Sequence, residues 1–177
     1  MQKLKNGFIQ IYTGNGKGKT TAALGQALRA AGSGLKSLII HFMKDYPYGE
    51  IEALKNLSNL ITLEQYGNDN FVIKKHLPDE KDKNFALMAL ERAKKAMINR
   101  EFDIIVLDEI CVTFYFHLLK VEDVLPLLEM KPDCVELILT GRYCPEQLLE
   151  RADLITEMKE VKHYYQKGII SRKGIES

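Results

Sequence analysis

The stretch "TGNGKGKTT" at residues 13–21 decides the fold that this sequence predicts. It follows a strand-like run, "FIQIYT" (8–13), and precedes a helix-like run that begins near Lys19. A glycine-rich loop between a strand and a helix, ending in Gly-Lys-Thr, is typical of a phosphate-binding loop. The usual first glycine of the pattern is replaced by Thr13, and we expect Gly14 to make the turn in its place.

The residue types in this loop suit the binding of an anion. Glycines let successive backbone N–H groups converge on a phosphate, and the start of the following helix adds further N–H groups and the positive end of its dipole. Lys19 supplies a positive charge, and Thr20 offers a hydroxyl to Mg²⁺. A glycine-rich turn without a ligand is the alternative. We predict that the loop binds a triphosphate through Thr13, Gly14, Asn15, Gly16, Lys17, Gly18, Lys19, Thr20 and Thr21.

Strand-like and helix-like runs alternate along the rest of the chain. Several strand-like runs are almost continuously apolar, as expected when helices cover both faces of a parallel sheet. The strand-like runs are 8–13, 37–43, 60–66, 103–109, 135–141 and 154–161, and the helix-like runs are 20–31, 82–99, 121–130 and 145–152. We predict polar loops at 44–58 and 67–81 and an irregular, exposed stretch over the last fifteen residues. The predicted fold is a single α/β domain over residues 1–177, with a mostly parallel sheet flanked by helices, as in RecA-like P-loop NTPases.

An acidic pair ends one of the strand-like runs. The run "IIVLDE" places Asp108 and Glu109 directly after four apolar residues. In P-loop proteins an acid at the end of a neighbouring strand reaches the Mg²⁺ that accompanies the phosphates. We therefore predict that Asp108 or Glu109 holds a metal together with Thr20. The alternative is that the acids cap the next helix.

Charge and composition restrict the partners that this chain can have. It has 177 residues, a net charge of +1, 46% hydrophobic residues and 28% charged residues, which is typical of a globular protein. We expect no nucleic-acid partner, because no strongly basic surface follows from this charge. We also expect no membrane partner, because the longest apolar runs fall far below the ~18 residues that cross a bilayer.

The cysteine and histidine spacings point to free thiols and to no structural zinc site. Cys111, Cys134 and Cys144 form no C-x-x-C pair, and the four histidines form no H-x-x-x-H pair. Three free thiols are typical of a reducing compartment, so we expect a cytoplasmic location. Any metal is then expected to be a hard ion that arrives with phosphate.

Three stretches together resemble a known family. They are "IYTGNGKGKTTAALGQALRAAG" (11–32), "VLDEI" (106–110) and "LILTGRYCPEQLLERADLITEMKEVKHYYQKGI" (137–169). They are similar to the ATP:corrinoid adenosyltransferases, whose motifs T-G-N-G-K-G-K-[ST]-T, L-T-G-R, A-D-L-x-[ST]-E-[ML] and V-K-H-x-x-x-x-G are all present. The resemblance extends from Ile9 to about Glu176.

The resemblance implies an unusual use of ATP. In this family a reduced Co(I) corrinoid, such as cobalamin or cobyrinic acid diamide, attacks the ribose 5′ carbon of ATP, and the whole triphosphate leaves with Mg²⁺ or Mn²⁺. The loop then holds a leaving group, with the nucleotide reversed relative to other P-loop proteins. By this resemblance Lys19 and Glu109 are catalytic, and Lys17, Arg29 and Arg142 bind the nucleotide. For the last three residues, solvent-exposed or loop-bracing roles are the alternative.

The corrinoid side of the site is where this sequence departs from the family. Many members have G-F-x-W after the third strand, whereas this chain contains no tryptophan. We predict that Phe71 packs on the lower face of the corrin, with Tyr46 and Tyr48 as weaker candidates; packing of Phe71 into the core is the alternative. The resemblance also implies a homodimer and a flavoprotein reductase that supplies electrons.

Two other functions are compatible with the loop and the acidic pair. The first is an ordinary P-loop NTPase or small-molecule kinase, in which Asp108 and Glu109 serve Mg²⁺ and position water. The second is a nucleotide-gated binding module without chemistry of its own. The released product distinguishes them, because the first forms ADP and the second forms none.

Overall fold

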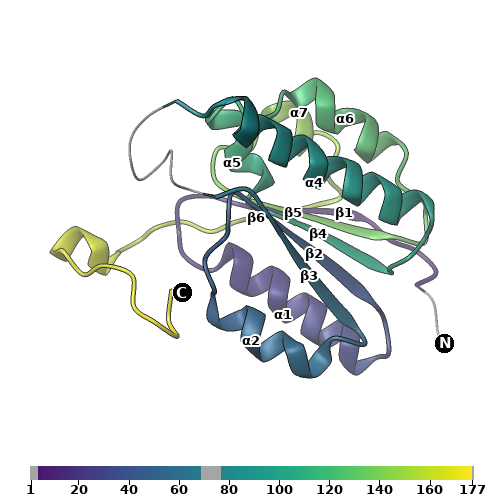
Figure 1. Ribbon diagram of the computed structural model, residues 1–177, viewed down its shortest axis with the longest axis horizontal. Coiled ribbons are helices and arrows are strands. Elements are labelled where there is room, and N and C mark those ends of the chain that lie inside the picture. Colours follow the sequence, from purple (N-terminus) through teal and green to yellow (C-terminus); the bar gives the residue numbers. More distant parts are fainter. Residues whose placement is uncertain (1–3, 69–76, 177) are drawn as a thin grey trace.

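The computed structural model describes residues 4–68 and 77–176. Strands and helices alternate along the chain, as predicted (Figure 1). The strands are β1 (Ile9–Thr13), β2 (Ser37–Phe42), β3 (Ile61–Tyr66), β4 (Ile104–Asp108), β5 (Glu136–Thr140) and β6 (Leu154–Glu157). The helices are α1 (Lys19–Gly32), α2 (Gly49–Leu54), α4 (Glu80–Ile98), α5 (Ile110–Tyr115), α6 (Val121–Glu129) and α7 (Glu146–Leu149), with short 3₁₀ helices η1 (Lys55–Leu57) and η2 (Tyr164–Lys167).

The strands form one parallel sheet in the order β3-β2-β4-β5-β1-β6. Because the strands are parallel, their carboxyl ends lie at one edge of the sheet, where open α/β sheets bind their ligands. The glycine loop after β1 therefore lies at the same edge as the ends of β2, β4 and β5. This arrangement confirms the predicted fold class, an α/β protein with a parallel sheet flanked by helices.

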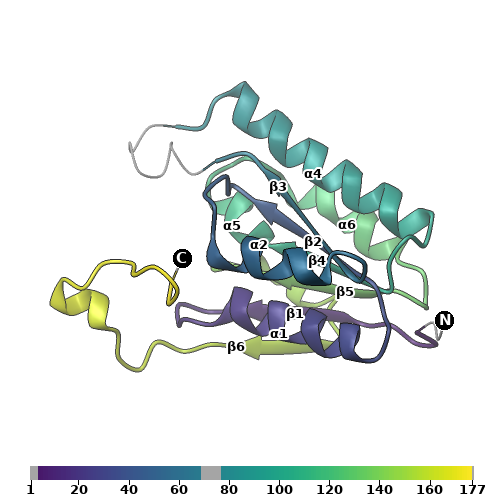
Figure 2. The same ribbon diagram turned by 60° about the horizontal axis from the view of Figure 1, so that its bottom comes forward.

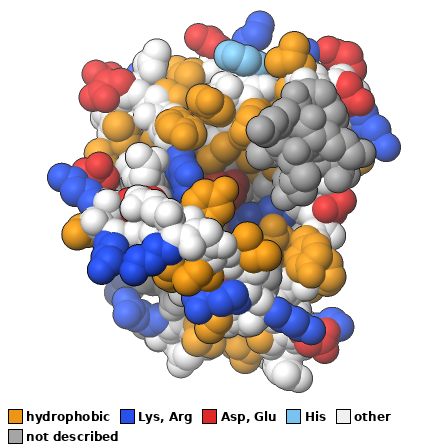
Figure 3. Space-filling view, turned by 90° about the vertical axis from the view of Figure 1, so that its left-hand side faces the viewer, with side chains coloured by type: hydrophobic (Ala, Val, Ile, Leu, Met, Phe, Trp, Pro, Cys, Tyr) orange, Lys and Arg blue, Asp and Glu red, His pale blue; other side chains and the backbone are white. Residues whose placement is uncertain are grey.

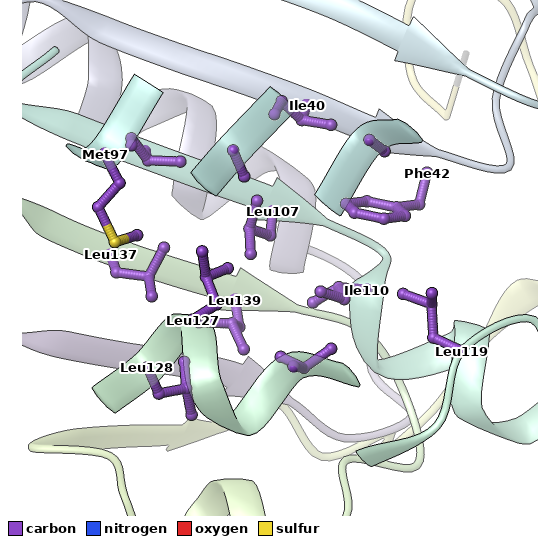
Figure 4. Close-up of a cluster of buried hydrophobic side chains, with 14 of the residues drawn as sticks. Ile40, Phe42, Met97, Leu107, Ile110, Leu119, Leu127, Leu128, Leu137 and Leu139 are labelled. Atoms are coloured by element: carbon purple, nitrogen blue, oxygen red, sulfur yellow. The ribbon is translucent and has the colours of Figure 1, made fainter. Parts of the chain in front are cut away.

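Helices cover both faces of the sheet and create two cores. Figure 1 shows α1 and α2 on one face and α4, α5, α6 and α7 on the other. Successive strand side chains point to opposite faces, so each buried strand supplies both cores. The larger core, beneath α4 and α6, includes Ile40, Phe42, Met97, Leu107, Leu127, Leu137 and Leu139 (Figure 4). The smaller core packs Ala23, Ala27, Ala30 and Ala31 of α1 against Ile39, Val106 and Ile138 of the sheet.

Two of the predicted boundaries are wrong. The strand predicted over 154–161 ends at Glu157, because the chain then leaves the sheet to pass beside the glycine loop. The loop predicted over 44–58 contains α2 and η1 between Gly49 and Leu57. Leu54 and Leu57 of this segment pack against the core beneath α1, so tertiary contacts stabilise a helical segment that looked like a polar loop.

One short helix was not predicted, and another is shorter than predicted. Residues 110–115, "ICVTFY", have the β-branched and aromatic composition of a strand, yet they form α5, which buries Ile110 and Cys111 against the sheet. The helix predicted over 145–152 spans only Glu146–Leu149, and Pro145 precedes it as the N-cap instead of lying in its first turn.

The predictions for the loop 67–81 and for the C-terminal stretch are confirmed in part. In the predicted loop 67–81, α4 already begins at Glu80, where Asp79 and Asp82 form a capping box. After β6 the chain is mostly irregular and exposed up to Glu176, as predicted, and returns toward the start of α1 (Figures 1 and 2). Among the described residues, no helix is both long enough and apolar enough to span a bilayer.

Candidate nucleotide-binding site

The glycine loop connects β1 to α1 through two residues with positive φ. Gly14 has a φ of 94° and Gly18 has a φ of 120°, a region that side-chain-bearing residues rarely adopt. Gly14 therefore makes the turn that Thr13 leaves to it, as the sequence predicts. Gly18 precedes Lys19, the first residue of α1, so the free N–H groups of this helix face the loop.

The segment that follows β6 forms backbone hydrogen bonds with the glycine loop. The N–H of Met158 donates to the carbonyl of Thr13 at 2.8 Å, and the N–H of Gly16 donates to the carbonyl of Met158 at 2.7 Å. A Cβ at Gly14 or at Gly16 would lie 2.5 Å or 2.7 Å from that same carbonyl oxygen. Glycine is therefore required at both positions by the approach of another backbone.

Lys19 lies inside the loop that it belongs to. Its side chain is buried, and its Nζ donates to the carbonyls of Gly14 at 2.7 Å and Gly16 at 2.8 Å. Burial lowers the pKa of Lys19, while the nearby carboxylate of Glu109 opposes that shift. The loop therefore holds an ammonium group where the N–H groups of the loop and of α1 meet.

Asp108 ends β4 as a fully buried carboxylate with three neighbours. Its Oδ2 accepts a hydrogen bond from Lys44 Nζ at 2.6 Å, and its Oδ1 accepts one from Thr140 Oγ1 at 2.7 Å. His41 Nε2 lies 3.6 Å from Oδ2. Burial alone would raise the pKa of Asp108, but the charge of Lys44 and these hydrogen bonds hold it below its ordinary value. Asp108 is therefore held as an anion.

Glu109 follows in a different environment. It has a φ of 65° as the N-cap of α5, and its N–H donates to Thr140 Oγ1 at 2.9 Å. Burial and the charge of Asp108 raise its pKa, whereas the cations of Lys44, Lys19 and Arg142 lower it. A left-handed backbone at a non-glycine residue is costly and commonly found at functional sites. None of the described residues hydrogen-bonds the Glu109 carboxylate, so this acid is well placed to meet a ligand.

A cavity of about 380 Å³ lies beside the loop. Its lining combines the loop and α1 with Lys44, with Tyr48 at the start of α2, and with the returning C-terminal segment. Figure 3 views this edge of the sheet, with basic side chains around a central hollow. The loop and α1 contribute Lys17, Thr20, Thr21 and Leu24, and the C-terminal segment contributes Gly174, Ile175 and Glu176.

The remaining predicted site residues lie at different distances from the loop. Lys17 is exposed, and its Nζ donates to the carbonyl of Ile175 at 2.8 Å. Arg142 lies close enough to Lys19 and Glu109 to affect the pKa of both. Arg29 lies ten residues beyond Lys19 in the last turn of α1, about 15 Å along the helix, so the structure does not bring it to the loop.

The aromatic candidates for the corrin lie in different parts of the chain. Phe71 falls in residues 69–76, outside the described part of the chain. Tyr46 and Tyr48 contact each other edge to face, with ring centroids 5.5 Å apart. Tyr48 lines the cavity, and Lys44 Nζ lies 5.4 Å above its ring. Tyr46 is 57% exposed and does not line the cavity.

Three residues at the acidic end of the site were missed in the sequence analysis. They are His41, Lys44 and Thr140, which all contact Asp108. Each had a signal, because polar residues inside or directly after an apolar strand tend to face a ligand edge or one another. His41 even pairs in register with Asp108 across β2 and β4. Their partners could be identified only once the strand order was known.

The fold and the loop define this chain as a P-loop nucleotide-binding protein. The flagellar accessory protein FlaH from Methanocaldococcus jannaschii has a similar fold, with a TM-score of 0.60 at 15% identity over 87% of this chain and 72% of FlaH. Residues 5–177 match the family described as ATP:corrinoid adenosyltransferase BtuR/CobO/CobP, and the chain belongs to this family. This membership confirms the resemblance found in the sequence.

Curated relatives extend over nearly the whole chain. The corrinoid adenosyltransferase of Escherichia coli K12 is 34% identical over 178 residues, which cover 97% of this chain and 86% of that protein. The corrinoid adenosyltransferase CobA of Salmonella typhimurium LT2 is 33% identical over the same shares of both chains. Since both alignments include nearly the whole chain, the similarity is not confined to the glycine loop.

The burial of His41 predicts a specific loss of stability in acid. Burial lowers the pKa of His41 to about 4, whereas an unfolded histidine titrates near 6.5. Between these pH values the unfolded chain binds a proton that the folded chain does not, so the free energy of unfolding falls as the pH drops from 6.5 to 4. The contribution reaches about 3 kcal/mol. Urea unfolding of the native protein and of His41→Gln across this range measures it, and equal pH slopes in the two proteins would contradict the assignment.

The double contact of Thr140 predicts a measurable cost when its hydroxyl is removed. Thr140→Val leaves both Asp108 Oδ1 and the Glu109 N–H without their buried partner. The free energy of unfolding should fall by about 1–3 kcal/mol. Thr140→Ser keeps the hydroxyl and serves as the matched control. If valine and serine cost the same, then the loss reflects packing and the hydrogen bonds contribute nothing.

Proposed function

We propose that this protein transfers the 5′-deoxyadenosyl group of ATP to the Co(I) of a reduced corrinoid, in the synthesis or salvage of cobalamin, and releases triphosphate. The proposal is carried by one observation: a chain of the corrinoid adenosyltransferase family has a phosphate loop, an ammonium group and two acids at one edge of the sheet. In this reaction cobalt supplies the electron pair for the new Co–C bond. The C–O bond breaks at the 5′ carbon, and its electron pair leaves with the triphosphate.

The proposed work of the protein is to stabilise the charge that develops on the triphosphate. The free N–H groups of the loop and of α1 are fixed before the ligand arrives, so they need no rearrangement as the charge builds up. Lys19 would exchange the carbonyls of Gly14 and Gly16 for phosphate oxygens. Arg142, whose charge already acts on Lys19, adds a second cation at the same edge. We expect the leaving group to be stabilised more than the bound substrate.

The oxygen groups at this edge suit Mg²⁺ as the companion of the triphosphate. Mg²⁺ prefers a few carboxylate and hydroxyl ligands together with phosphate oxygens. Thr20 and Glu109 provide such groups, and Asp108 lies behind them with both oxygens already hydrogen-bonded. In the described part of the chain no three His, Cys, Asp or Glu residues form a metal cluster of their own. When bound, the ion would neutralise charge on the departing triphosphate.

Other expectations of the sequence analysis belong to this proposal as predictions. They are the packing of Phe71 on the corrin, a homodimer, a flavoprotein reductase as electron donor and a cytoplasmic location. Contact of Arg29 with the nucleotide is the one that the geometry supports least, because this arginine hydrogen-bonds Gln26 at the far end of α1.

An anaerobic assay with ATP and chemically reduced cobalamin tests the function. We expect the Co(I) absorption to disappear as tripolyphosphate forms in equal amount. The Lys19→Ala variant should lose about 10²–10³ in turnover, because it removes a charge next to the leaving group. Lys95→Ala is the matched control, since this exposed lysine lies in the last turn of α4, at the opposite edge of the sheet from the loop.

The products also distinguish the two alternatives. Formation of ADP would instead identify an ordinary NTPase or kinase. Tight ATP binding without any turnover would identify a binding module. Native-like turnover in Lys19→Ala would show that Lys19 does not contribute to the reaction.

A further inference from the structure

Two exposed tyrosines stack on each other at the carboxyl edge of the sheet. Tyr115 ends α5, and Tyr143 lies in the turn that leads from β5 to α7. Their ring centroids are 4.6 Å apart, with an angle of 24° between the ring planes. Phe116 packs edge to face on Tyr115, with the centroids 5.1 Å apart. Tyr115 and Tyr143 remain 57% and 54% exposed, so the stack presents aromatic surface to the solvent.

The two segments that carry these rings are fixed against each other. The N–H of Glu109, which caps α5, donates to Thr140 Oγ1 at the end of β5 at 2.9 Å. A Cβ at Gly141 would lie 2.9 Å from the Cβ of Cys111 and 3.1 Å from its backbone nitrogen, so the turn after β5 contacts the first turn of α5. The two rings are therefore attached to segments that cannot move far apart.

The backbone of Tyr143 has a conformation that tyrosine rarely adopts. Its φ is 59°, in the left-handed region that favours glycine and is costly for a bulky residue. Glu109 has a similar φ of 65° in the other segment. Side-chain-bearing residues in this region cluster at ligand sites, where the use of the side chain outweighs its cost. Folding alone favours glycine at position 143.

The stack lies beside the proposed nucleotide site but with the helices of the other face of the sheet. The cavity next to the glycine loop is lined from α1, α2 and the C-terminal segment, and neither Tyr115 nor Tyr143 belongs to that lining. Figure 1 shows α5 and α7 on the face opposite α1 and α2. Tyr143 directly follows Arg142, and Tyr115 lies six residues after Glu109. A substrate that approaches this edge from the face of α5 would therefore meet the stack.

We propose that the stack of Tyr115 and Tyr143 binds the corrinoid acceptor, with an apolar face of its macrocycle against the exposed rings. A stack of two aromatic rings can be extended by a further flat group, and the contact removes apolar surface of both partners from water. Adenine is the competing flat group, but the rings lie outside the cavity beside the phosphate loop. This inference rests on the proposed function, because the corrinoid is the second substrate of that reaction.

The Michaelis constants for the two substrates test this contact. Tyr115→Ala and Tyr143→Ala should each raise the KM for cob(I)alamin by about tenfold and leave the KM for ATP unchanged. Tyr115→Phe and Tyr143→Phe keep the rings and should keep the native KM for both substrates. Phe8→Ala is the matched control, since Phe8 is also 54% exposed but precedes β1, at the opposite edge of the sheet.

The Tyr143→Gly variant separates binding from folding. Glycine adopts a φ of 59° without strain, so the midpoint of urea unfolding should stay close to that of the native protein. The KM for cob(I)alamin should nevertheless rise as it does in Tyr143→Ala. Anaerobic equilibrium dialysis against cob(II)alamin, followed by visible absorption, measures acceptor binding without turnover. The affinity of Tyr143→Gly should be lower by about tenfold.

Two results would overturn the inference and leave the proposed function intact. The first is an active native protein whose alanine variants keep the native KM and the native affinity for cobalamin. The second is a raised KM for ATP in these variants, which would assign the stack to adenine. A native protein that neither binds cobalamin nor forms adenosylcobalamin would refute the proposed function itself, and the inference with it.

Discussion

The approach of the glycine loop to the backbone of Met158 is the constraint on which the rest of the site depends. Two hydrogen bonds tie Thr13 and Gly16 to Met158, and the gap between the backbones leaves no space for a Cβ at Gly14 or Gly16. The segment that follows the edge strand β6 thus fixes the position of the loop. This explains in physical terms why a chain with this loop also has the motif A-D-L-I-T-E-M, because that segment sets the position of the N–H groups.

A second constraint is the difference in environment between Asp108, which ends β4, and Glu109, which follows it. Asp108 is fully buried and keeps its charge because Lys44, Thr140 and His41 surround it. None of the described residues hydrogen-bonds the Glu109 carboxylate, and burial together with the charge of Asp108 raises its pKa. One carboxylate therefore organises the edge of the sheet. The other is available to a cation or to a ribose, which suits a site that brings a triphosphate and a large acceptor together.

Much of the fold could be predicted from the sequence, because the strands are short apolar runs and the loop has a specific pattern. Every predicted strand is present, and α1, α4 and α6 lie where helical spacing places them. The differences occur where tertiary contacts outweigh local preference. Residues 49–57, predicted as loop, form α2 and η1, because Leu54 and Leu57 pack against the core beneath α1. Residues 110–115, for which no element was predicted, form α5, which packs against the sheet.

The sequence identified the glycine loop and the acids Asp108 and Glu109 as candidate site residues. It did not identify the side chains that contact Asp108. Lys44 and Thr140 follow or end apolar strands that are far apart in the sequence, and only the strand order brings them to Asp108.

The affinity of the Gly16→Ala variant for MgATP, measured by isothermal titration calorimetry, tests the central claim most directly. Gly16 does not have a positive φ, so an added methyl group acts through its contacts with the backbone of Met158 and Lys159. The account predicts that binding weakens by on the order of 100-fold, or about 3 kcal/mol, while the protein stays folded. Gly25→Ala in α1, where a Cβ has no neighbour within 4 Å, should bind like the native protein. Native affinity in Gly16→Ala would contradict the account.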